Sequence, residues 1–167
     1  MMIHAPGATD NGITVEDMTE FVDLFPTLVE LAGFAPLKRC PEISKNVSVC
    51  TEGLSMTPFL NRSSPQRWKQ RVFSQYPRHG IKEMNGHSMN YMGYTMRTPR
   101  YRYTEWVQFS GAPRYEIKWN KKAGVELYDH DNDPEENVNL SQDKAYKLIA
   151  QKLSQQLHSG WRNALPT

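Results

Sequence analysis

The most regular pattern of apolar and polar positions lies between residues 91 and 109. Aromatic and β-favouring residues fill both halves of this stretch, and Arg97-Thr98-Pro99-Arg100 separates them. From Tyr101 onward the odd-numbered side chains share one face of an extended chain, and the even-numbered ones share the other. Pro99 marks the connection because proline has no amide hydrogen for strand pairing. The pattern predicts a β-hairpin of strands 91–97 and 101–109.

We expect one further strand on each side of this hairpin. Residues 71–76 and 125–128 have the short β-favouring runs of strands. Residues 110–123 read as a basic, aromatic connection and residues 129–139 as a polar turn. Residues 143–164 then carry apolar positions at helical spacing. The apolar face of this helix is formed by Tyr146, Ile149, Leu153, Leu157 and Trp161. These elements predict an α+β fold, a four-stranded antiparallel sheet with a C-terminal helix across one face.

The first part of the chain has a different pattern. Residues 22–33 are its clearest helix, with Asp23 placed to cap the first turn and Gly33 placed to end the last one. Residues 1–5 read as a short buried strand, and residues 57–60 as a helical turn. The apolar stripe of the helix consists of Leu24, Leu28 and Leu31.

This apolar stripe has no partner nearby in the sequence. One strand and one helix cannot bury both faces of a sheet. We therefore expect residues 1–70 to be a strand-helix remnant at the C-terminal end of a larger α/β domain, followed by a linker. Residues 71–167 are expected to form a small separate subdomain.

Composition narrows the choice of function only slightly. The 167 residues carry a net charge of +2, which is too small to indicate a nucleic-acid partner. The sequence has no apolar run of the length that a membrane-spanning helix needs. Residues 1–7 lack the basic region of a signal peptide. Met1 is therefore expected to be an internal residue of a longer protein or the start of a shortened one.

The two cysteines, Cys40 and Cys50, lie in a loop-like segment. A disulfide between them would close a short loop and help to order it, and two free thiols are the alternative. Three N-x-S/T sequons favour the oxidising environment in which disulfides form. They begin at Asn46, Asn61 and Asn139.

Two groups of residues suggest a metal site, but neither has the spacing of ligands that such a site requires. Residues 129–133 alternate acidic side chains as a calcium-binding loop does, but Pro134 replaces the required glycine and Leu140 the required glutamate. The five histidines have no helical ligand spacing, and neither cysteine has a C-x-x-C partner. The residues alone therefore give no complete catalytic set and no metal site.

Arginine and tyrosine alternate where the two hairpin strands meet, over residues 97–103. Platforms for single-stranded nucleic acid combine such residues, because bases stack on the rings and phosphates bind the cations. The alternative is a sheet with its aromatic side chains packed inward and its arginines solvated. We favour this alternative and expect no nucleic-acid partner.

The order of several segments resembles the C-terminal part of sulfatases of the alkaline-phosphatase superfamily. Residues 5–7, 22–33 and 126–140 carry the family-wide likeness, and the likeness covers nearly the whole chain. Narrower motifs point to the iduronate-2-sulfatase branch of this family. They are Ser74-Gln-Tyr-Pro-Arg78, Met92-Gly-Tyr-Thr-Met-Arg-Thr98 and Tyr101-Arg-Tyr-Thr-Glu-Trp106, together with the spacing of Cys40 and Cys50.

The resemblance implies a lysosomal hydrolase that removes the 2-O-sulfate of iduronate in dermatan and heparan sulfate. Such enzymes use a formylglycine, made from the cysteine of a C-x-P-S-R motif, beside a calcium ion. Pro-Glu-Ile-Ser follows Cys40 and Thr-Glu-Gly-Leu follows Cys50, so neither cysteine fits that motif. We therefore transfer no catalytic or metal residue to this chain, and calcium is expected only in the full-length family.

In the family the small subdomain lines one side of the substrate cleft. The resemblance therefore nominates the cationic and aromatic residues of this region, Arg78, His79, Lys82, His87 and Trp106, as a wall that contacts a sulfated glycosaminoglycan. We expect the chain to be inactive by itself and to belong to the lysosome or the secretory pathway. The alternative from another functional class is a non-catalytic glycosaminoglycan-binding module.

Overall fold

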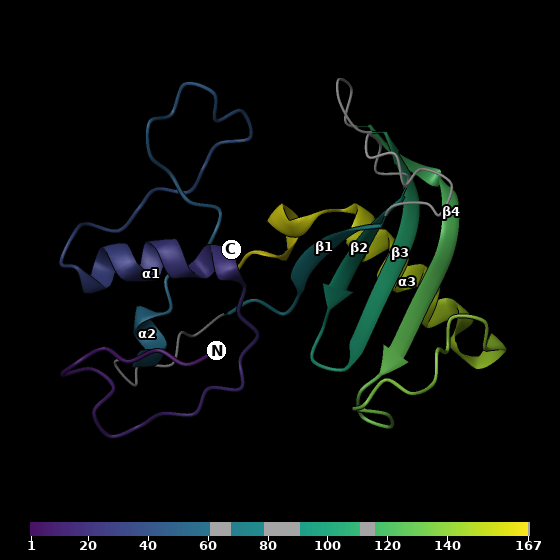
Figure 1. The fold of residues 1–167 in the computed structure, drawn as a ribbon, viewed down its shortest axis with the longest axis horizontal. Helices are drawn as coiled ribbons and strands as arrows, with labels where there is room; N and C mark the ends of the chain where they lie inside the picture. Colours follow the sequence, from purple (N-terminus) through teal and green to yellow (C-terminus); the bar gives the residue numbers. More distant parts are fainter. Residues whose placement is uncertain (61–67, 79–90, 111–115, 167) are drawn as a thin grey trace. The chain divides into compact units, whose positions relative to one another are not determined.

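The computed structural model describes residues 1–60, 68–78, 91–110 and 116–166. The chain separates into two compact units, residues 1–69 and residues 70–165 (Figure 1). We refer to them as unit 1 and unit 2. The assignment of unit 1 to a larger α/β domain stays a prediction.

The described part of unit 1, residues 1–60 and 68–69, contains one regular helix and one short helical turn. The helix α1 (Leu24–Leu31) continues directly from a 3₁₀ turn at Phe21–Asp23 (Figure 1). The second helix, α2 (Thr57–Leu60), is a single turn. Both lie where the sequence pattern predicts helix, and Pro26 is accommodated in the first turn of α1, where its missing amide hydrogen has no helical partner to lose.

The buried face of α1 is polar. The Asp23 carboxylate is fully buried and accepts hydrogen bonds from the Leu54 amide at 2.8 Å and from Lys69 Nζ at 2.6 Å. The Thr27 hydroxyl, also buried, accepts one from the Met56 amide at 2.8 Å. These bonds join α1 to segments far along the chain, so polar contacts rather than apolar packing fix the helix in unit 1.

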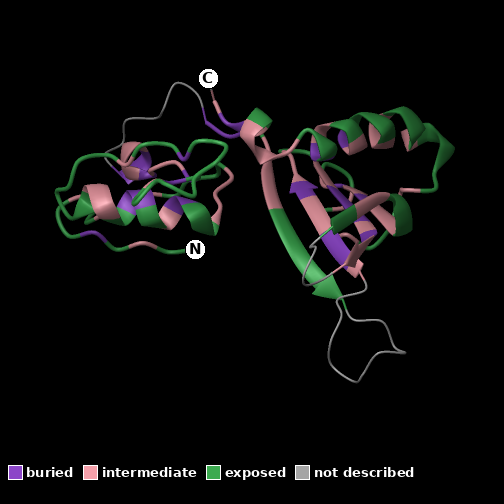
Figure 2. Cartoon of the chain, turned by 90° about the horizontal axis from the view of Figure 1, so that it is seen from above, coloured by how far each residue is buried: buried purple, intermediate pink, exposed green. Residues whose placement is uncertain are grey.

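The apolar face of α1 is correspondingly open (Figure 2). Phe25 is 50% exposed, Leu28 is 59% exposed and Leu31 is 38% exposed. Leu24 is the exception, because it packs against the small core of the unit. The absence of a local partner for Leu28 and Leu31 agrees with the sequence pattern. The core of unit 1 consists of Met56, Phe59 and Trp68.

The prediction of a strand at residues 1–5 is wrong. The Ala5 carbonyl accepts hydrogen bonds from the amides of Ala8 and Thr9, each at 3.0 Å, and the Ala5 amide donates to the Thr9 hydroxyl. A turn therefore takes the backbone groups that a strand would offer to a neighbour. No β-ladder forms in the described part of unit 1 beyond an isolated bridge between Arg39 and Thr51.

Cys40 and Cys50 form a disulfide, as one of the two sequence-based alternatives predicted. The Cys40 amide also donates to the Thr51 carbonyl at 2.9 Å, so the two ends of the loop are held by a covalent and a hydrogen bond. Asn46 lies inside this loop and is exposed.

Unit 2 is a sheet of four antiparallel strands in the order β1-β2-β3-β4. The strands are β1 (Val72–Arg78), β2 (Tyr91–Arg97), β3 (Tyr101–Ser110) and β4 (Glu116–Asp129) (Figure 1). The helix α3 (Lys147–His158) packs on one face through contacts with β2 and β3. The predicted fold class is confirmed.

The core of unit 2 lies between α3 and the middle strands. Met96, Tyr103 and Leu127 come from three neighbouring strands, and Leu153 and Leu157 come from α3. All five side chains are almost fully buried. Because Tyr103 packs with Leu153 and Leu157, the odd-numbered face of β3 faces the helix, and its side chains share one face as their alternation predicts.

Most of β1, by contrast, is exposed (Figure 2).

The helix predicted over residues 143–164 is shorter and interrupted. Asp143 caps a 3₁₀ turn at Lys144–Tyr146, α3 ends at His158, and a second 3₁₀ turn covers Trp161–Ala164. Gly160 stands between the last two elements with a φ of 79°. A left-handed residue cannot continue a right-handed helix, so the glycine ends it.

The connection predicted over residues 110–123 is wrong from Glu116 onward, because β4 begins there. The pairing with β3 jumps from Lys122 opposite Val107 to Lys118 opposite Gln108, which leaves residues 119–121 outside the ladder. This bulge breaks the alternation of side chains in β4. The first part of β4 therefore lacks the regular alternation of apolar and polar side chains from which a strand is predicted.

Candidate functional site

Trp106 lies near the middle of the sheet, on the face opposite α3. It pairs with Gly93 of β2 on one side and with Gly124 of β4 on the other. Its Nε1 donates a hydrogen bond to Glu126 Oε1 at 2.7 Å. A Cβ atom on Gly93 would come within 2.8 Å of the indole, so the ring occupies space that only a glycine leaves open. The indole is thereby fixed in position.

The structure brings two of the nominated cleft residues together. Arg78 is the last residue of β1, and its guanidinium carbon lies 5.8 Å from the centre of the Trp106 ring. Arg78 is exposed, and Trp106 is partly exposed. A cation and an indole on one sheet face offer the two contacts that an anionic sugar uses, charge-assisted hydrogen bonding and ring stacking. His79, Lys82 and His87 lie outside the described residues.

The arginine–tyrosine mixture at the other end of the hairpin is engaged within the protein. Arg102 pairs with Glu136 and stacks on Tyr128, with its guanidinium carbon 5.0 Å from the ring centre. Arg97 Nη2 lies 2.8 Å from Nδ1 of His130. Tyr103 is only 3% exposed, so it cannot stack on a base. These contacts agree with the alternative of a packed sheet for Arg97, Arg102 and Tyr103.

A buried carboxylate on the helix-facing side of the sheet is the residue that sequence reasoning missed. Glu105 is fully buried, and its Oε1 accepts hydrogen bonds from Tyr103, Lys122 and Ser154 at 2.7–2.8 Å. Its Oε2 lies 2.8 Å from Nε2 of His158. One carboxylate thus joins β3, β4 and α3. The available signal was its odd-numbered position on the apolar face of the strand, because a charge there needs a partner.

The hydrogen bonds set the ionisation of this group. Burial alone would raise the pKa of Glu105, but the donors Lys122, Ser154, His158 and Tyr103 outweigh it and hold the pKa below its ordinary value. Burial also raises the pKa of Tyr103, and the hydrogen bond to Glu105 raises it further. The carboxylate is therefore ionised and the phenol neutral at physiological pH.

The carboxylates of the acidic turn at the end of β4 accept hydrogen bonds from within the protein. The Asp129 carboxylate accepts bonds from Arg100 Nε at 2.8 Å and Arg100 Nη2 at 2.7 Å, and also from Asn132 and Tyr146. Asp133 accepts a bond from the Val138 amide. Protein donors thus occupy the oxygens that a cation would need, and the expectation of a polar turn is confirmed.

The described residues show neither a cluster of metal-ligating side chains nor a membrane-spanning helix. In these ranges, histidine, cysteine, aspartate and glutamate side chains form no group of three or more that could hold a metal ion. The helices of these ranges also lack the combination of length and apolar character that crossing a bilayer requires.

The asparagines of the described sequons differ in whether the side-chain amide is hydrogen-bonded within the protein. The Asn139 amide is tied to the strand beside it, since its Oδ1 accepts from the Leu127 amide at 3.0 Å and its Nδ2 donates to the Val125 carbonyl at 3.1 Å. Asn46 is exposed, and Asn61 lies outside the described residues. Of the two described sequons, only the one at Asn46 leaves the side-chain amide nitrogen open to modification.

Comparison with known proteins now defines the class. Residues 1–163 match the model of the family "N-sulphoglucosamine sulphohydrolase, C-terminal". The chain belongs to this family of sulfatase C-terminal regions. It is 34% identical over 151 residues to iduronate 2-sulfatase of Mus musculus, covering 82% of this chain and 27% of that protein. It is 34% identical over 145 residues to iduronate 2-sulfatase of Homo sapiens, covering 76% of this chain and 26% of that protein.

Solved structures support the same fold. A protein of Bacteroides thetaiotaomicron assigned to the sulfatases superposes with a TM-score of 0.56 at 26% identity, covering 82% of this chain and 23% of that chain. Phosphonate monoester hydrolase of Silicibacter pomeroyi gives a TM-score of 0.64 at 22% identity, covering 97% and 28%. The chain spans about a quarter of the length of the curated relatives that it matches.

Proposed function

We propose that this chain serves as the C-terminal part of a sulfuric ester hydrolase that removes the 2-O-sulfate of iduronate in dermatan and heparan sulfate. The family match over residues 1–163 and the identity to two iduronate 2-sulfatases support this proposal. The single structural observation that carries it is the Arg78–Trp106 pair, which presents a cation beside an indole on the face of the sheet opposite α3.

Each member of this pair has a distinct role in binding. The guanidinium of Arg78 offers paired N–H donors that match the oxygens of a sulfate or carboxylate group. The indole of Trp106 offers an apolar face to a sugar ring, and Glu126 and Gly93 keep that face in place. In this proposal unit 2 forms one wall of the substrate cleft and carries no bond-breaking step.

The chemical step would come from the rest of a longer polypeptide. Cys40 and Cys50 are joined in a disulfide, so neither is available as the precursor of a formylglycine. When bound in a sulfatase of this kind, calcium would neutralise sulfate charge, but the described residues provide no group that fits it. We therefore propose that the 167 residues have no sulfatase activity by themselves.

The open apolar face of α1 supports the existence of such a longer polypeptide. Phe25, Leu28 and Leu31 are exposed on one helix, and α1 is held in unit 1 by its polar face instead. The curated relatives extend well beyond the part that matches this chain. We assign this face to the remaining part of a sulfatase domain, which would cover it as a core helix is covered.

A secretory or lysosomal location is part of the same proposal. The Cys40–Cys50 disulfide is typical of an oxidising compartment, and the exposed Asn46 sequon is compatible with glycosylation there.

Titration of the chain with a dermatan-sulfate hexasaccharide tests the sugar-binding role. Arg78→Ala and Trp106→Ala should each weaken binding about fivefold, the effect of losing roughly 1 kcal/mol. Arg162→Ala is the matched control, because Arg162 also stacks on a tryptophan, Trp161, with 4.5 Å between the guanidinium carbon and the ring centre. Equal losses in all three variants would refute a specific role for the Arg78–Trp106 pair.

An activity assay and the upstream coding sequence test the hydrolase role. The purified 167 residues should show no turnover of a 2-O-sulfated iduronide. An in-frame C-x-P-S-R motif and paired aspartates upstream of Met1 would support the longer enzyme. A stop codon directly before Met1 would instead favour the non-catalytic glycosaminoglycan-binding module.

A further inference from the structure

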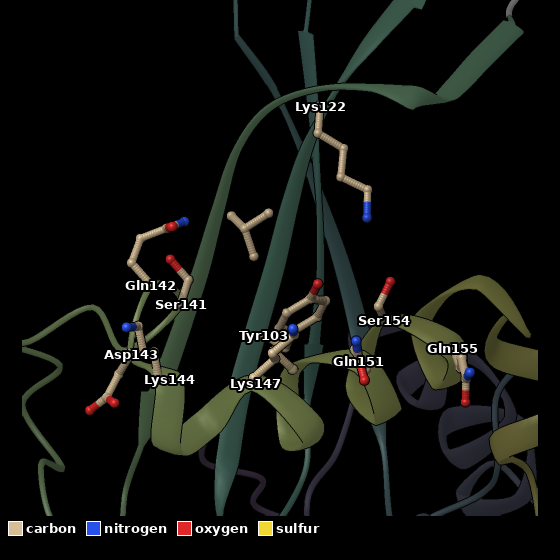
Figure 3. Close-up of a pocket in the computed structure, with 12 residues that line it drawn as sticks. Tyr103, Lys122, Ser141, Gln142, Asp143, Lys144, Lys147, Gln151, Ser154 and Gln155 are labelled. Atoms are coloured by element: carbon tan, nitrogen blue, oxygen red, sulfur yellow. The ribbon is translucent and has the colours of Figure 1, made fainter.

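A cleft of about 750 Å³ opens on the helix-facing side of unit 2, between the strands and the start of α3 (Figure 3). Tyr103 and Lys122 line it from β3 and β4. Lys144, Lys147 and Ser154 line it from the segment that leads into α3 and from α3 itself. Trp106 projects from the opposite face of the sheet, so this cleft is separate from the Arg78–Trp106 pair. Its size is within the range of saccharide and other small-molecule sites.

The charges around the cleft are predominantly positive. Lys144 and Lys147 are exposed and lie on its rim, and Lys122 reaches in from β4 (Figure 3). Asp143 is the one acidic side chain of the lining, and its carboxylate caps the following turn by accepting the Ala145 amide at 2.8 Å. Three ammonium groups thus face two carboxylates, that of Asp143 and that of the buried Glu105, which pairs with Lys122, and the excess of positive charge favours an anionic ligand.

Glu105 holds the floor of the cleft in place. The hydroxyls of Tyr103 and Ser154 both donate to Glu105 Oε1, and the partly exposed Ser154 keeps its oxygen lone pairs for another donor. Lys122 Nζ uses one of its three protons on the same oxygen at 2.7 Å. The side chain of Lys122 is 35% exposed, which leaves its ammonium accessible from the cleft. The floor thus presents the ammonium group of Lys122 and the hydroxyl oxygen of Ser154 in fixed positions.

From this geometry we propose that the cleft is a second saccharide-binding site, which takes a sulfated or carboxylated sugar unit of the same chain that the Arg78–Trp106 pair contacts. The inference rests on the proposed function for the identity of the polymer. The lysines supply the charge, and the hydroxyl of Ser154 and the amide of Gln151 supply hydrogen bonds for sugar hydroxyls. Two sites on opposite faces of the sheet would let one long polyanion be held at two points.

The test uses nuclear magnetic resonance titration of the 167-residue chain with a dermatan-sulfate hexasaccharide. The double variant Lys144→Gln, Lys147→Gln should weaken the affinity reported by amides around Ser154 about five- to tenfold. Lys152→Gln is the matched control, since Lys152 is an exposed lysine of the same helix that does not line the cleft. It should change the affinity less than about twofold.

The two sets of variants distinguish a failure of the second site from a failure of the Arg78–Trp106 pair. If the double variant behaves like Lys152→Gln, the second site is refuted whatever Arg78→Ala does. If Arg78→Ala binds as the wild type does while the double variant is weakened, the cleft stands and the role of the Arg78–Trp106 pair falls. A separate titration with inorganic sulfate tests whether the cleft recognises the sugar or only its anionic group. Equal affinity for sulfate alone would overturn a saccharide site in favour of a simple anion site.

Discussion

The six-membered ring of Trp106 lies against the backbone of Gly93, so that a Cβ atom at residue 93 would stand 2.8 Å from its Cζ3 atom. Gly124 flanks the same indole from the other neighbouring strand, but a Cβ atom there would stand 3.7 Å from Cδ1, an ordinary contact. Of the two glycines beside the indole, only Gly93 is required for space.

Gly93→Ala should therefore displace the indole, whereas Gly124→Ala should not. Overpacking of this kind costs about 1–3 kcal/mol, and we expect a lower melting temperature together with a shifted indole N–H resonance of Trp106. The Gly124→Ala variant serves as the control and should keep both properties near the wild type. Equal effects of the two substitutions would show that the Trp106 ring can be accommodated elsewhere.

Glu105→Gln should destabilise unit 2 by about 3 kcal/mol, since the substitution removes a buried charge, leaves Lys122 without its ionic partner and takes the carboxylate from His158. Urea unfolding followed by the fluorescence of the nearby Trp119, which stacks on His158, would measure it. Glu116→Gln, at an exposed position of β4, is the control and should have little effect. A stable Glu105→Gln protein would mean that the hydrogen bonds suffice without the charge.

The stability of unit 2 should fall as the solution is acidified. Hydrogen bonds from Arg100 hold the pKa of Asp129 below its ordinary value, and the donors around Glu105 do the same for that group. A carboxyl with a lowered folded-state pKa contributes its stabilisation fully above its unfolded-state pKa of about 4 and loses it as the pH falls further. Urea midpoints at pH 7, 5 and 3 should decline mainly between the last two. In the variant Glu105→Gln, Asp129→Asn this decline should be much smaller.

The sequons at Asn46 and Asn139 should respond differently to substitution and to glycosylation. Asn139→Gln should cost about 1 kcal/mol, because the Asn139 side chain, although exposed, bonds the Leu127 amide and the Val125 carbonyl. Asn46→Gln should be nearly neutral, because Asn46 is exposed. In a secretory expression host, mass spectrometry of glycopeptides should find a glycan at Asn46 and none at Asn139. A glycan at Asn139 in a folded protein would contradict the hydrogen-bonding role.

The apolar face of α1 should make the isolated chain associate with itself. Leu28 is 59% exposed among other apolar side chains, and Leu28→Gln should shift the sedimentation profile toward the monomer. Leu148→Gln is the control, because Leu148 is 78% exposed on α3 and lies outside this face. Equal suppression of association by both variants would argue against α1 as the contact.

The hairpin and the fold class could be predicted because local patterns determine them. The alternation of side chains from Tyr101 onward and the position of Pro99 placed strands β2 and β3 almost to the residue. The end of α3 was missed although Gly160 was a readable stop signal. The length of β4 could not have been read, because its bulge removes the period on which strand prediction depends.

The candidate site was only partly predictable. Arg78 and Trp106 were nominated from a family resemblance, but their proximity depends on the register of three strands, which no local pattern encodes. The cleft at α3 depends on Lys122 and Ser154, which are far apart in the sequence and meet only through the fold. Glu105 shows what could have been done better, because a carboxylate on the apolar face of a strand predicts a buried network.

The strand order β1-β2-β3-β4 has a consequence for how the chain acquires its structure. Every strand pairs with its neighbour in the sequence, so each ladder can close soon after the preceding one has formed. Sheets whose contacts are local in sequence reach the native state faster than sheets that must join distant segments. We therefore expect the sheet of unit 2 to form before α3 docks on it, because the contact of His158 with Glu105 joins residues 53 positions apart.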